Sequence, residues 1–407
     1  MEDGEVSLHE ELRAFDRFGK ATLCEMRPVA TELMPVYVNE FWTAKQRDAH
    51  PLHEISYRAC FKPQVPRFFI ERLTKAGDVV YDPFSGRGTT ALEAALLGRR
   101  PIANDINPLS RILVEPRLSP PTIDEVAARL TEIPIEASAQ ADIDLSMFYH
   151  PQTLAEICSL RTYLRSRRES GTEDHVDRWI RMVATNRLTG HSPGFFSVYT
   201  FPPNQAVSAQ AQIKINERRA QKPDYRDVRK LIQRKTQTLL KTISEDGRAQ
   251  LAKAKVRFVE GDARATSAIT DRSVQLTVTS PPFLDVVQYA DDNWLRCWFN
   301  GIAVDTVAEQ ISTPSRVSEW TALIGAVMCE LHRITARGGH VAFEVGEVRG
   351  GTVRLEEHVV PVAIAAGFDC EGVLIHEQNF TKTAHIWGVA NNRAGTNSNR
   401  IVLLRRC

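Results

Sequence analysis

The sequence predicts an α/β fold in which a doubly wound, mostly parallel sheet carries a helical insertion. A strand, a glycine-rich turn, a helix and a second strand follow one another between residues 79 and 105, which is the order of a βαβ unit. Residues 274–278 resume the strand pattern far downstream, whereas residues 137–247 have helical periodicity. The βαβ unit implies a parallel sheet, and the change of pattern marks an insertion.

The first part of the chain divides near residue 54. Apolar residues at helical spacing, such as Leu8 and Leu12, predict a helical N-terminal layer over residues 1–54. Residues 61–66 predict a loop that leads into a helix at 67–73. Residues 55–136 then contain the βαβ unit and form the first half of the sheet domain.

Residues 248–407 are expected to complete the same domain. Its predicted strands are 256–259, 274–278, 340–345, 372–376 and 401–404, and its predicted helices are 320–335 and 355–366. We expect the last two strands to form an antiparallel edge of the sheet.

Composition places the chain among ordinary globular proteins. The 407 residues are 43% hydrophobic and 25% charged, which allows a sizeable core. We find neither an N-terminal secretion signal nor an apolar run that could span a bilayer, so we expect a cytoplasmic, nucleoid-associated protein without membrane contact. The seven cysteines are scattered and the histidines are not grouped, so no metal site is predicted. His191 is interpreted as a buried, hydrogen-bonded histidine, with contact to a base or phosphate as the alternative.

Basic charge is concentrated inside the insertion. Between Lys214 and Lys241 there are ten Lys or Arg and three acids, an excess of +7, while the net charge of the chain is only +1. This excess predicts phosphate contacts with nucleic acid, although a solvated helical face would look the same. The candidate residues are Lys214, Arg218, Arg219, Lys222, Arg229 and Lys230. Sequence readout is expected between Gly190 and Lys214, where Phe195, Phe196, Tyr199 and Phe201 would insert between bases or stack on them.

A ligand site is predicted at the turn that follows the strand at 79–81. Gly86 and Gly88 allow close approach of a ligand to backbone amides, and Asp105 lies where an acid would contact a ribose. This pattern also fits a dinucleotide, so an oxidoreductase is an alternative. Asp82, directly before the turn, would repel a pyrophosphate but attract the cationic amine of a methionine moiety. We therefore predict S-adenosylmethionine as the cofactor.

A second motif, Thr279-Ser280-Pro281-Pro282-Phe283, suits chemistry on an exocyclic amine. The lone pair of such an amine is delocalised into the ring, so acceptors must hold the nitrogen in its reactive form. Ser280 Oγ and the carbonyl of Pro281 can be these acceptors, Pro282 stiffens the backbone, and Phe283 can stack on an extruded base. A proline-rich end of a strand is the structural alternative.

These two motifs together resemble the amino-methylating DNA methyltransferases, over residues 55–120 and 255–405. The resemblance implies a Rossmann-like methyltransferase sheet, with Asp82 at the methionine end of the donor, Asp105 at the ribose and Asp262 at the adenine. Lys62, Phe84, Gly86, Gly88, Thr89, Thr90 and Ala263 complete the expected donor site. A Ser-Pro-Pro sequence followed by an aromatic residue is most typical of cytosine-N4 enzymes, although adenine-N6 enzymes include serine forms.

The sequence therefore predicts an enzyme that methylates the N4 amine of cytosine in double-stranded DNA with a flipped base, and releases S-adenosylhomocysteine. Residues 137–247 would recognise the target, and a restriction or defence partner would accompany the enzyme. Adenine-N6 methylation is the first alternative and RNA methylation the second. A further alternative, from a different functional class, is a DNA-binding protein without catalytic activity. Methylation at carbon 5 is disfavoured because no cysteine follows a proline.

Overall fold

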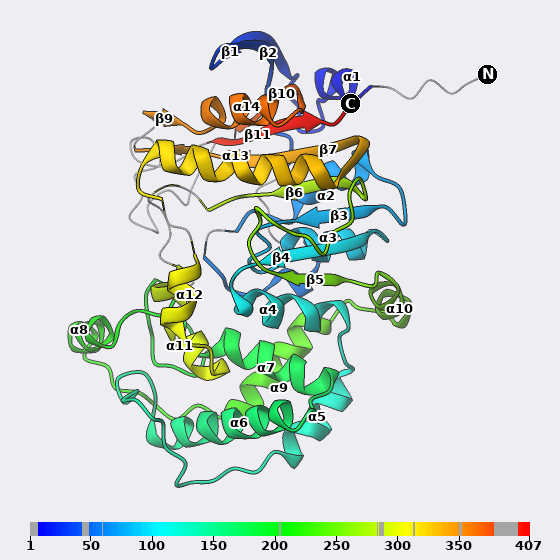
Figure 1. The fold of residues 1–407 in the computed structure, drawn as a ribbon. Helices are drawn as coiled ribbons and strands as arrows, with labels where there is room; N and C mark the ends of the chain where they lie inside the picture. The colour runs from blue at the N-terminus through cyan, green and yellow to red at the C-terminus, as the bar shows by residue number, and fades with distance from the viewer. Residues whose placement is uncertain are drawn as a thin grey trace.

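A nine-stranded sheet forms the centre of the computed structural model (Figure 1). The structure describes residues 7–42, 49–58, 60–202, 205–282, 284, 289–311, 314–349, 352–377 and 398–407. The strands lie in the order β1-β2-β10-β11-β7-β6-β3-β4-β5. Their bounds are β1 Leu23–Val29, β2 Glu32–Asn39, β3 Val79–Asp82, β4 Arg100–Asp105, β5 Arg257–Glu260, β6 Val274–Thr279, β7 Thr335–Val345, β10 Asp369–Glu377 and β11 Ser398–Arg405.

The strands β5-β4-β3-β6-β7 are mutually parallel, which confirms the predicted doubly wound sheet. After β3 the chain adds β4 and β5 on one side, then returns to add β6 and β7 on the other. The carboxyl ends of β3 and β6 therefore flank the point where the strand order reverses. In open α/β sheets this switch point is where ligands bind.

The other side of the sheet differs in part from the prediction. β10 and β11 pair in antiparallel fashion as expected, but they do not form the edge, because β2 pairs with β10 and β1 pairs with β2. The helical N-terminal layer was wrong for residues 23–39, which form this hairpin; among the described residues before it, α1 (Leu8–Ala14) is helical. Met34, Val36 and Val38 recur at every second residue, which is the period of a strand.

Helices cover both faces of the sheet. α13 (Val317–Ile334) and α14 (Glu356–Ala365) pack with β7, β10 and β11 in one core cluster. α2 (Gln64–Leu73), which begins three residues earlier than predicted, packs on the opposite face with α1 and residues of β6 and β7. The remaining elements near the sheet are α3 Thr89–Leu96, α4 Pro108–Leu118, η2 Pro51–His53 and the short pair β8 Glu347–Val348 and β9 Val353–Arg354.

A separate helical lobe lies beyond the β5 side of the sheet in Figure 1. Its helices are α5 Ile123–Glu132, α6 Pro151–Glu169, α7 His175–Arg187, α8 Ala209–Arg219, α9 Val228–Leu240, α11 Tyr289–Asn300 and α12 Val304–Gln310. α10 Glu245–Lys253 lies beside β5 and contacts α3. The helical character predicted for residues 137–247 is confirmed. Trp179 and Ile232 belong to a core that also includes residues of α3 and α4, so the lobe and the sheet share one hydrophobic cluster. Among the described helices, none has the length and hydropathy of a membrane span.

Candidate functional site

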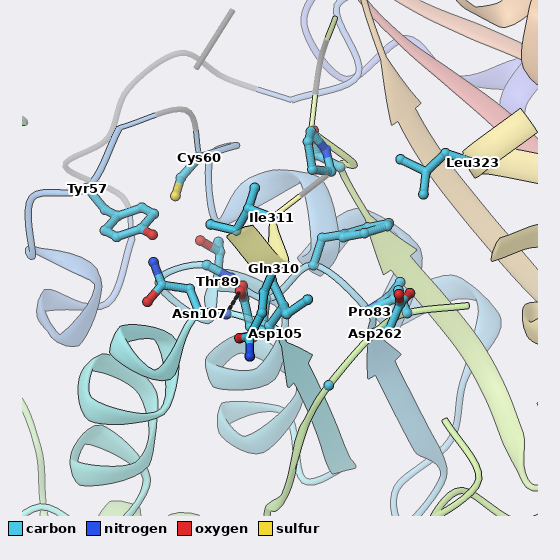
Figure 2. Close-up of a pocket in the computed structure, with 18 of the residues that line it drawn as sticks. Tyr57, Cys60, Pro83, Thr89, Asp105, Asn107, Asp262, Gln310, Ile311 and Leu323 are labelled. Atoms are coloured by element: carbon cyan, nitrogen blue, oxygen red, sulfur yellow. Dashed lines mark hydrogen bonds between the residues drawn. The ribbon is translucent and has the colours of Figure 1, made fainter. Parts of the chain in front are cut away.

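A pocket of about 920 Å3, including its open mouth, lies at the carboxyl ends of β3, β4 and β6 (Figure 2). Asp105 and Asn107 form one wall, Tyr57 and Cys60 lie above them, and Asp262 lies across the pocket. Among the predicted site residues, the following line the pocket: Phe84, Gly86, Thr89, Asp105, Asp262, Ala263, Ser280 and Pro282. Lys62, Asp82, Gly88, Thr90 and Pro281 do not line it, and Phe283 is outside the described residues.

The glycine-rich turn has the conformation that its sequence predicts. Gly86 has φ +51° and Gly88 has φ +74°, both in the left-handed region that favours glycine. A Cβ on Gly88 would lie 2.3 Å from Cγ2 of Val114, so α4 packs directly against the turn. This contact brings the amino end of α3 close to the pocket.

Two arginines that sequence reasoning missed hold the turn in place. The fully buried Arg117 donates to the carbonyl of Arg87. Arg87 in turn donates to the carbonyls of Ile55 at 3.1 Å and Phe61 at 3.4 Å. The turn is thereby tied to the segment that contributes Tyr57 and Cys60 to the pocket. Arg87 is far in sequence from Ile55 and Phe61, so no local sequence pattern predicts these hydrogen bonds.

Asp105 lines the pocket and already accepts two backbone hydrogen bonds. Its Oδ2 accepts from Gly86 N at 2.7 Å and its Oδ1 from Asn107 N at 2.9 Å. Burial raises the pKa of Asp105 to about 6, although these bonds favour the ionised form. The carboxylate therefore links the ends of β3 and β4 and still faces the pocket.

Asp82 has a different environment from the one expected of a ligand-binding acid. It is 1% exposed, and its Oδ1 accepts from Phe84 N at 3.1 Å and from Thr279 Oγ1 at 2.6 Å. Burial raises the pKa of Asp82 to about 7, against hydrogen bonds from Thr279, Phe84 and Thr90 that lower it. In the structure Asp82 therefore joins the end of β3 to the residue that precedes Ser280.

The second motif reaches the same pocket from β6. Ser280 and Pro282 line the pocket, and Pro281 between them is buried. Trp320 Nε1 donates to the carbonyl of Pro282 at 2.9 Å, which fixes the backbone directly after the strand. The structure thus brings two distant motifs together, as the sequence predicted.

One predicted residue and three that sequence reasoning missed also line the pocket. Asp262 is paired with Arg264 through 2.9 Å and 3.0 Å bonds from Nε, and this hydrogen bonding lowers the pKa of Asp262. Gln310 and Ile311, at the end of α12, and Leu323 of α13 also line the pocket. No sequence motif distinguishes these last three residues.

The basic segment is divided between two helices. Lys214, Arg218 and Arg219 are exposed on α8, which in Figure 1 projects from the rest of the lobe on the side toward which β3 and β4 point. Arg229 of α9 is half-buried and donates to the carbonyl of Ile133. The remaining candidates are less buried: Lys222 follows α8, and the exposed Lys230 of α9 pairs with Asp227 at 3.2 Å.

Two of the aromatic residues expected to contact bases are buried. Phe195 is 6% exposed and Phe196 is 1% exposed, so both pack inside the lobe. Tyr199 is half-buried, with the Arg219 guanidinium 3.9 Å from its ring centroid, and Phe201 is 37% exposed. The interpretation of His191 as buried was wrong, because this residue is exposed.

Comparison with known sequences gives a match to the family described as DNA methylase over residues 21–112. A type II methyltransferase, M.MjaII of Methanocaldococcus jannaschii, is 32% identical over 74 residues, which are 18% of this chain and 14% of that protein. M.BsoBI of Geobacillus stearothermophilus, also a type II methyltransferase, is 41% identical over 64 residues, 16% and 13% of the two chains. These matches confirm the resemblance to the amino-methylating enzymes, and they span about one seventh of either relative.

Solved structures give a weaker likeness. The match with TrmN from Thermus thermophilus covers 86% of this chain and 50% of that one, with a TM-score of 0.33 and 13% identity. A second Thermus thermophilus protein, TTHA0409, is described as a putative DNA modification methylase complexed with S-adenosyl-L-methionine. Its match covers 36% of this chain and 53% of that one, with a TM-score of 0.23 and 20% identity. The fold assignment therefore depends on the strand order itself.

Proposed function

We propose, from the match of residues 21–112 to the DNA methylase family, that the chain is an S-adenosylmethionine-dependent DNA methyltransferase acting on the N4 amine of cytosine. One observation carries the proposal: Ser280 lines the same pocket as Gly86 and Asp105. An amine held at Ser280 would thus lie beside a donor held at the glycine turn. Proximity and orientation of the two reactants would supply most of the acceleration.

The pocket residues fit the proposed donor. The turn at Gly86 exposes backbone to the pocket, and Asp105 can accept from ribose hydroxyls. Asn107 Nδ2 is buried at the pocket wall without a hydrogen-bond partner among the described residues. A buried polar atom of this kind is satisfied when a ligand binds. When bound, S-adenosylmethionine supplies a sulfonium methyl group.

Residues of the second motif would prepare the acceptor. Ser280 Oγ and the Pro281 carbonyl accept hydrogen bonds from the amine and favour its pyramidal form. Trp320 holds the carbonyl of Pro282, so the backbone that carries both acceptors is already fixed before the base arrives. Asp82 contributes by orienting Thr279, and its second proposed role is contact with the methionine amine of the donor. Phe283 is proposed to stack on the base.

DNA is the proposed partner, with α8 as the main phosphate-binding element. Lys214, Arg218 and Arg219 project from an element on the side of the carboxyl ends of the strands, where an extruded base would enter. Residues 137–247 would then be the target-recognition region, and the names of the two type II relatives support a restriction partner.

Nucleoside mass spectrometry of DNA from cells that express the protein tests the proposal. We expect N4-methylcytosine with the wild type and much less with Ser280→Ala, whose binding of S-adenosylhomocysteine should be unchanged. Ser273→Ala, just before the amino end of the same strand, is the matched control and should make the normal product. If the product is N6-methyladenine, the enzyme acts on adenine instead of cytosine. If methylated bases occur only in RNA, the substrate is RNA. If no methylated base is found, the proposal is refuted.

A further inference from the structure

Glu344 is a buried carboxyl beside Ser280. Thr279 of β6 pairs in register with Phe343 of β7, so Ser280 and Glu344 occupy the next positions on two neighbouring parallel strands. Glu344 is 6% exposed, and its Oε2 has no hydrogen-bond partner within the described part of the chain. Isolation of a polar group in the interior is costly, so this oxygen is a candidate for contact with a bound ligand.

Glu344 and Ser280 face the same side of the sheet. Ala342 packs into the core cluster on the α2 face, and Phe343 packs into the cluster on the α13 face. Because successive side chains of a strand alternate, Glu344 returns to the α2 face. Val278 of β6 packs in the cluster on the α2 face. If the alternation continues for one residue past the end of β6, Ser280 faces the same side. The two side chains are therefore lateral neighbours at the carboxyl edge of the sheet.

A second buried polar atom lies on this face of the sheet. His376 of β10 stacks on Trp42 with ring centroids 4.3 Å apart, and its Nδ1 accepts from Phe41 N at 3.1 Å. Burial, with the nearby charge of Lys62, lowers the pKa of His376 to about 3, so the neutral ring carries its proton on Nε2. This Nε2 also lacks a partner among the residues described. The α2 face of the sheet thus offers two unmatched polar groups, Glu344 on β7 next to Ser280 and His376 on β10, beyond β11.

The protonation of Glu344 suits a base with an amine. Burial raises the pKa of this carboxyl to about 8, so at neutral pH its protonated form provides one O–H donor and one carbonyl acceptor. Cytosine presents an amine donor next to a ring-nitrogen acceptor, and adenine presents the same pair on its Watson–Crick edge. The O–H of a protonated carboxyl is complementary to the ring nitrogen of either base.

We propose that Glu344 binds the acceptor base: its O–H donates to the ring nitrogen, while Ser280 and the Pro281 carbonyl accept the two hydrogens of the neighbouring amine. This inference rests on the proposed function. It adds a residue outside both sequence motifs to the site, and it places the acceptor base over the ends of β6 and β7. The donor pocket, which Glu344 does not line, remains on the β3 side.

Three variants at Glu344 test the inference. Glu344→Leu has similar volume but no polar atoms, and methyl transfer to unmethylated genomic DNA should lose at least about tenfold in kcat/KM, the loss of one hydrogen bond. Glu344→Gln keeps a donor beside an acceptor and should stay close to the wild type. Glu344→Asp keeps the carboxyl but shortens its reach, so its apparent KM for DNA should rise. All three should bind S-adenosylhomocysteine normally by calorimetry.

Glu371 of β10 provides a matched control, because it is a carboxyl 14% exposed at the opposite end of the sheet, paired with His340 and Arg405. Glu371→Leu should leave kcat/KM for DNA unchanged. Wild-type turnover in Glu344→Leu would overturn the inference while the proposed function stands. Equal losses of kcat/KM in Glu344→Leu and Glu344→Gln would overturn the proposal that a protonated, uncharged Glu344 hydrogen-bonds the base. If the wild type itself methylates no DNA, the proposed function fails first.

Discussion

At Gly88 both the backbone conformation and the packing exclude a side chain. The residue has φ +74°, and an added Cβ would meet Val114 at 2.3 Å. The motif glycine therefore does more than bring backbone to a ligand, because it also lets α4 pack against the start of α3. Binding and stability depend on the same residue.

Gly88→Ala should reduce the free energy of unfolding by at least about 2 kcal/mol, since it combines a left-handed residue with overpacking. Denaturant titration measures this loss. Gly77→Ala is the control: its φ is +87° but nothing lies within 4 Å of the added Cβ, so it should show the backbone cost alone. Equal losses for the two variants would show that contact with Val114 is relieved without cost.

The pH dependence of stability offers a separate prediction at Glu344. Burial raises its pKa from 4.5 to about 8, so the ionised unfolded chain is favoured as pH rises between these values. Glu344→Gln removes this cost, and its stability advantage over the wild type should grow from pH 5 to pH 8, reaching a few kcal/mol, on the order of 1.4 per pKa unit. Thermal or denaturant unfolding at several pH values measures it.

Glu371→Gln should behave in the opposite way. Burial alone would raise the pKa of Glu371, but the hydrogen bond and charge of His340, with His9 and Arg405, lower it overall. Its ionised form therefore stabilises the fold above the pKa of the unfolded chain, and the variant should be less stable than the wild type at pH 7. The same sign for both variants would contradict the environments described for these two carboxyls.

At the scale of elements, α8 and α9 divide a basic segment that looks uniform in the sequence. α8 carries its cations on an exposed arm, whereas Ile232, Leu239 and Leu240 of α9 are buried in the lobe. Charge counting could not separate the two helices, because the separation depends on which side of each helix packs. The net charge of residues 214–241 predicts a nucleic-acid partner, but it does not tell which of the two helices would contact the phosphates.

Exchange of Lys214, Arg218 and Arg219 for glutamine should weaken DNA binding and reduce the slope of log K against log salt concentration by up to about 0.9 per lost phosphate contact. The comparison variant replaces three exposed cations of and after α9, namely Lys230, Arg234 and Lys241. It should keep the wild-type slope. A reduced slope in the second variant alone would assign the phosphate contacts to α9.

Local sequence patterns predicted the helices and strands better than they predicted which of these elements pack together. The βαβ unit, the helices of the insertion and the strands at 274–278 and 340–345 could be predicted because each has its own periodicity. The hairpin β1 and β2 could not, because short apolar segments near residues 23–39 also fit a helix. The role of Arg117 and the position of Glu344 depend on contacts between distant segments, for which a single sequence gives no signal.

At the scale of the whole molecule, the site lies where the strand order reverses, and ligand binding should stabilise the entire sheet. S-adenosylhomocysteine at about 100 times its Kd should raise the free energy of unfolding by about 2.7 kcal/mol. Thermal melting with and without the ligand measures this shift, with NAD at the same concentration as the control. Stabilisation by NAD but not by S-adenosylhomocysteine would show that the pocket binds a dinucleotide, as in the oxidoreductase alternative.

The pairing of β2 with β10 also has a consequence for the order in which the protein folds. On the side of β2 away from β1, residues 36–39 pair with residues 373–376, so during synthesis the hairpin emerges long before the strand that joins it to the sheet. Until then one side of the hairpin has no neighbour, and Leu23, Met26 and Leu33 are exposed even in the finished fold. A ribosome-bound chain would carry the hairpin without this neighbour until residues 373–376 have been made, so the hairpin joins the sheet late in folding.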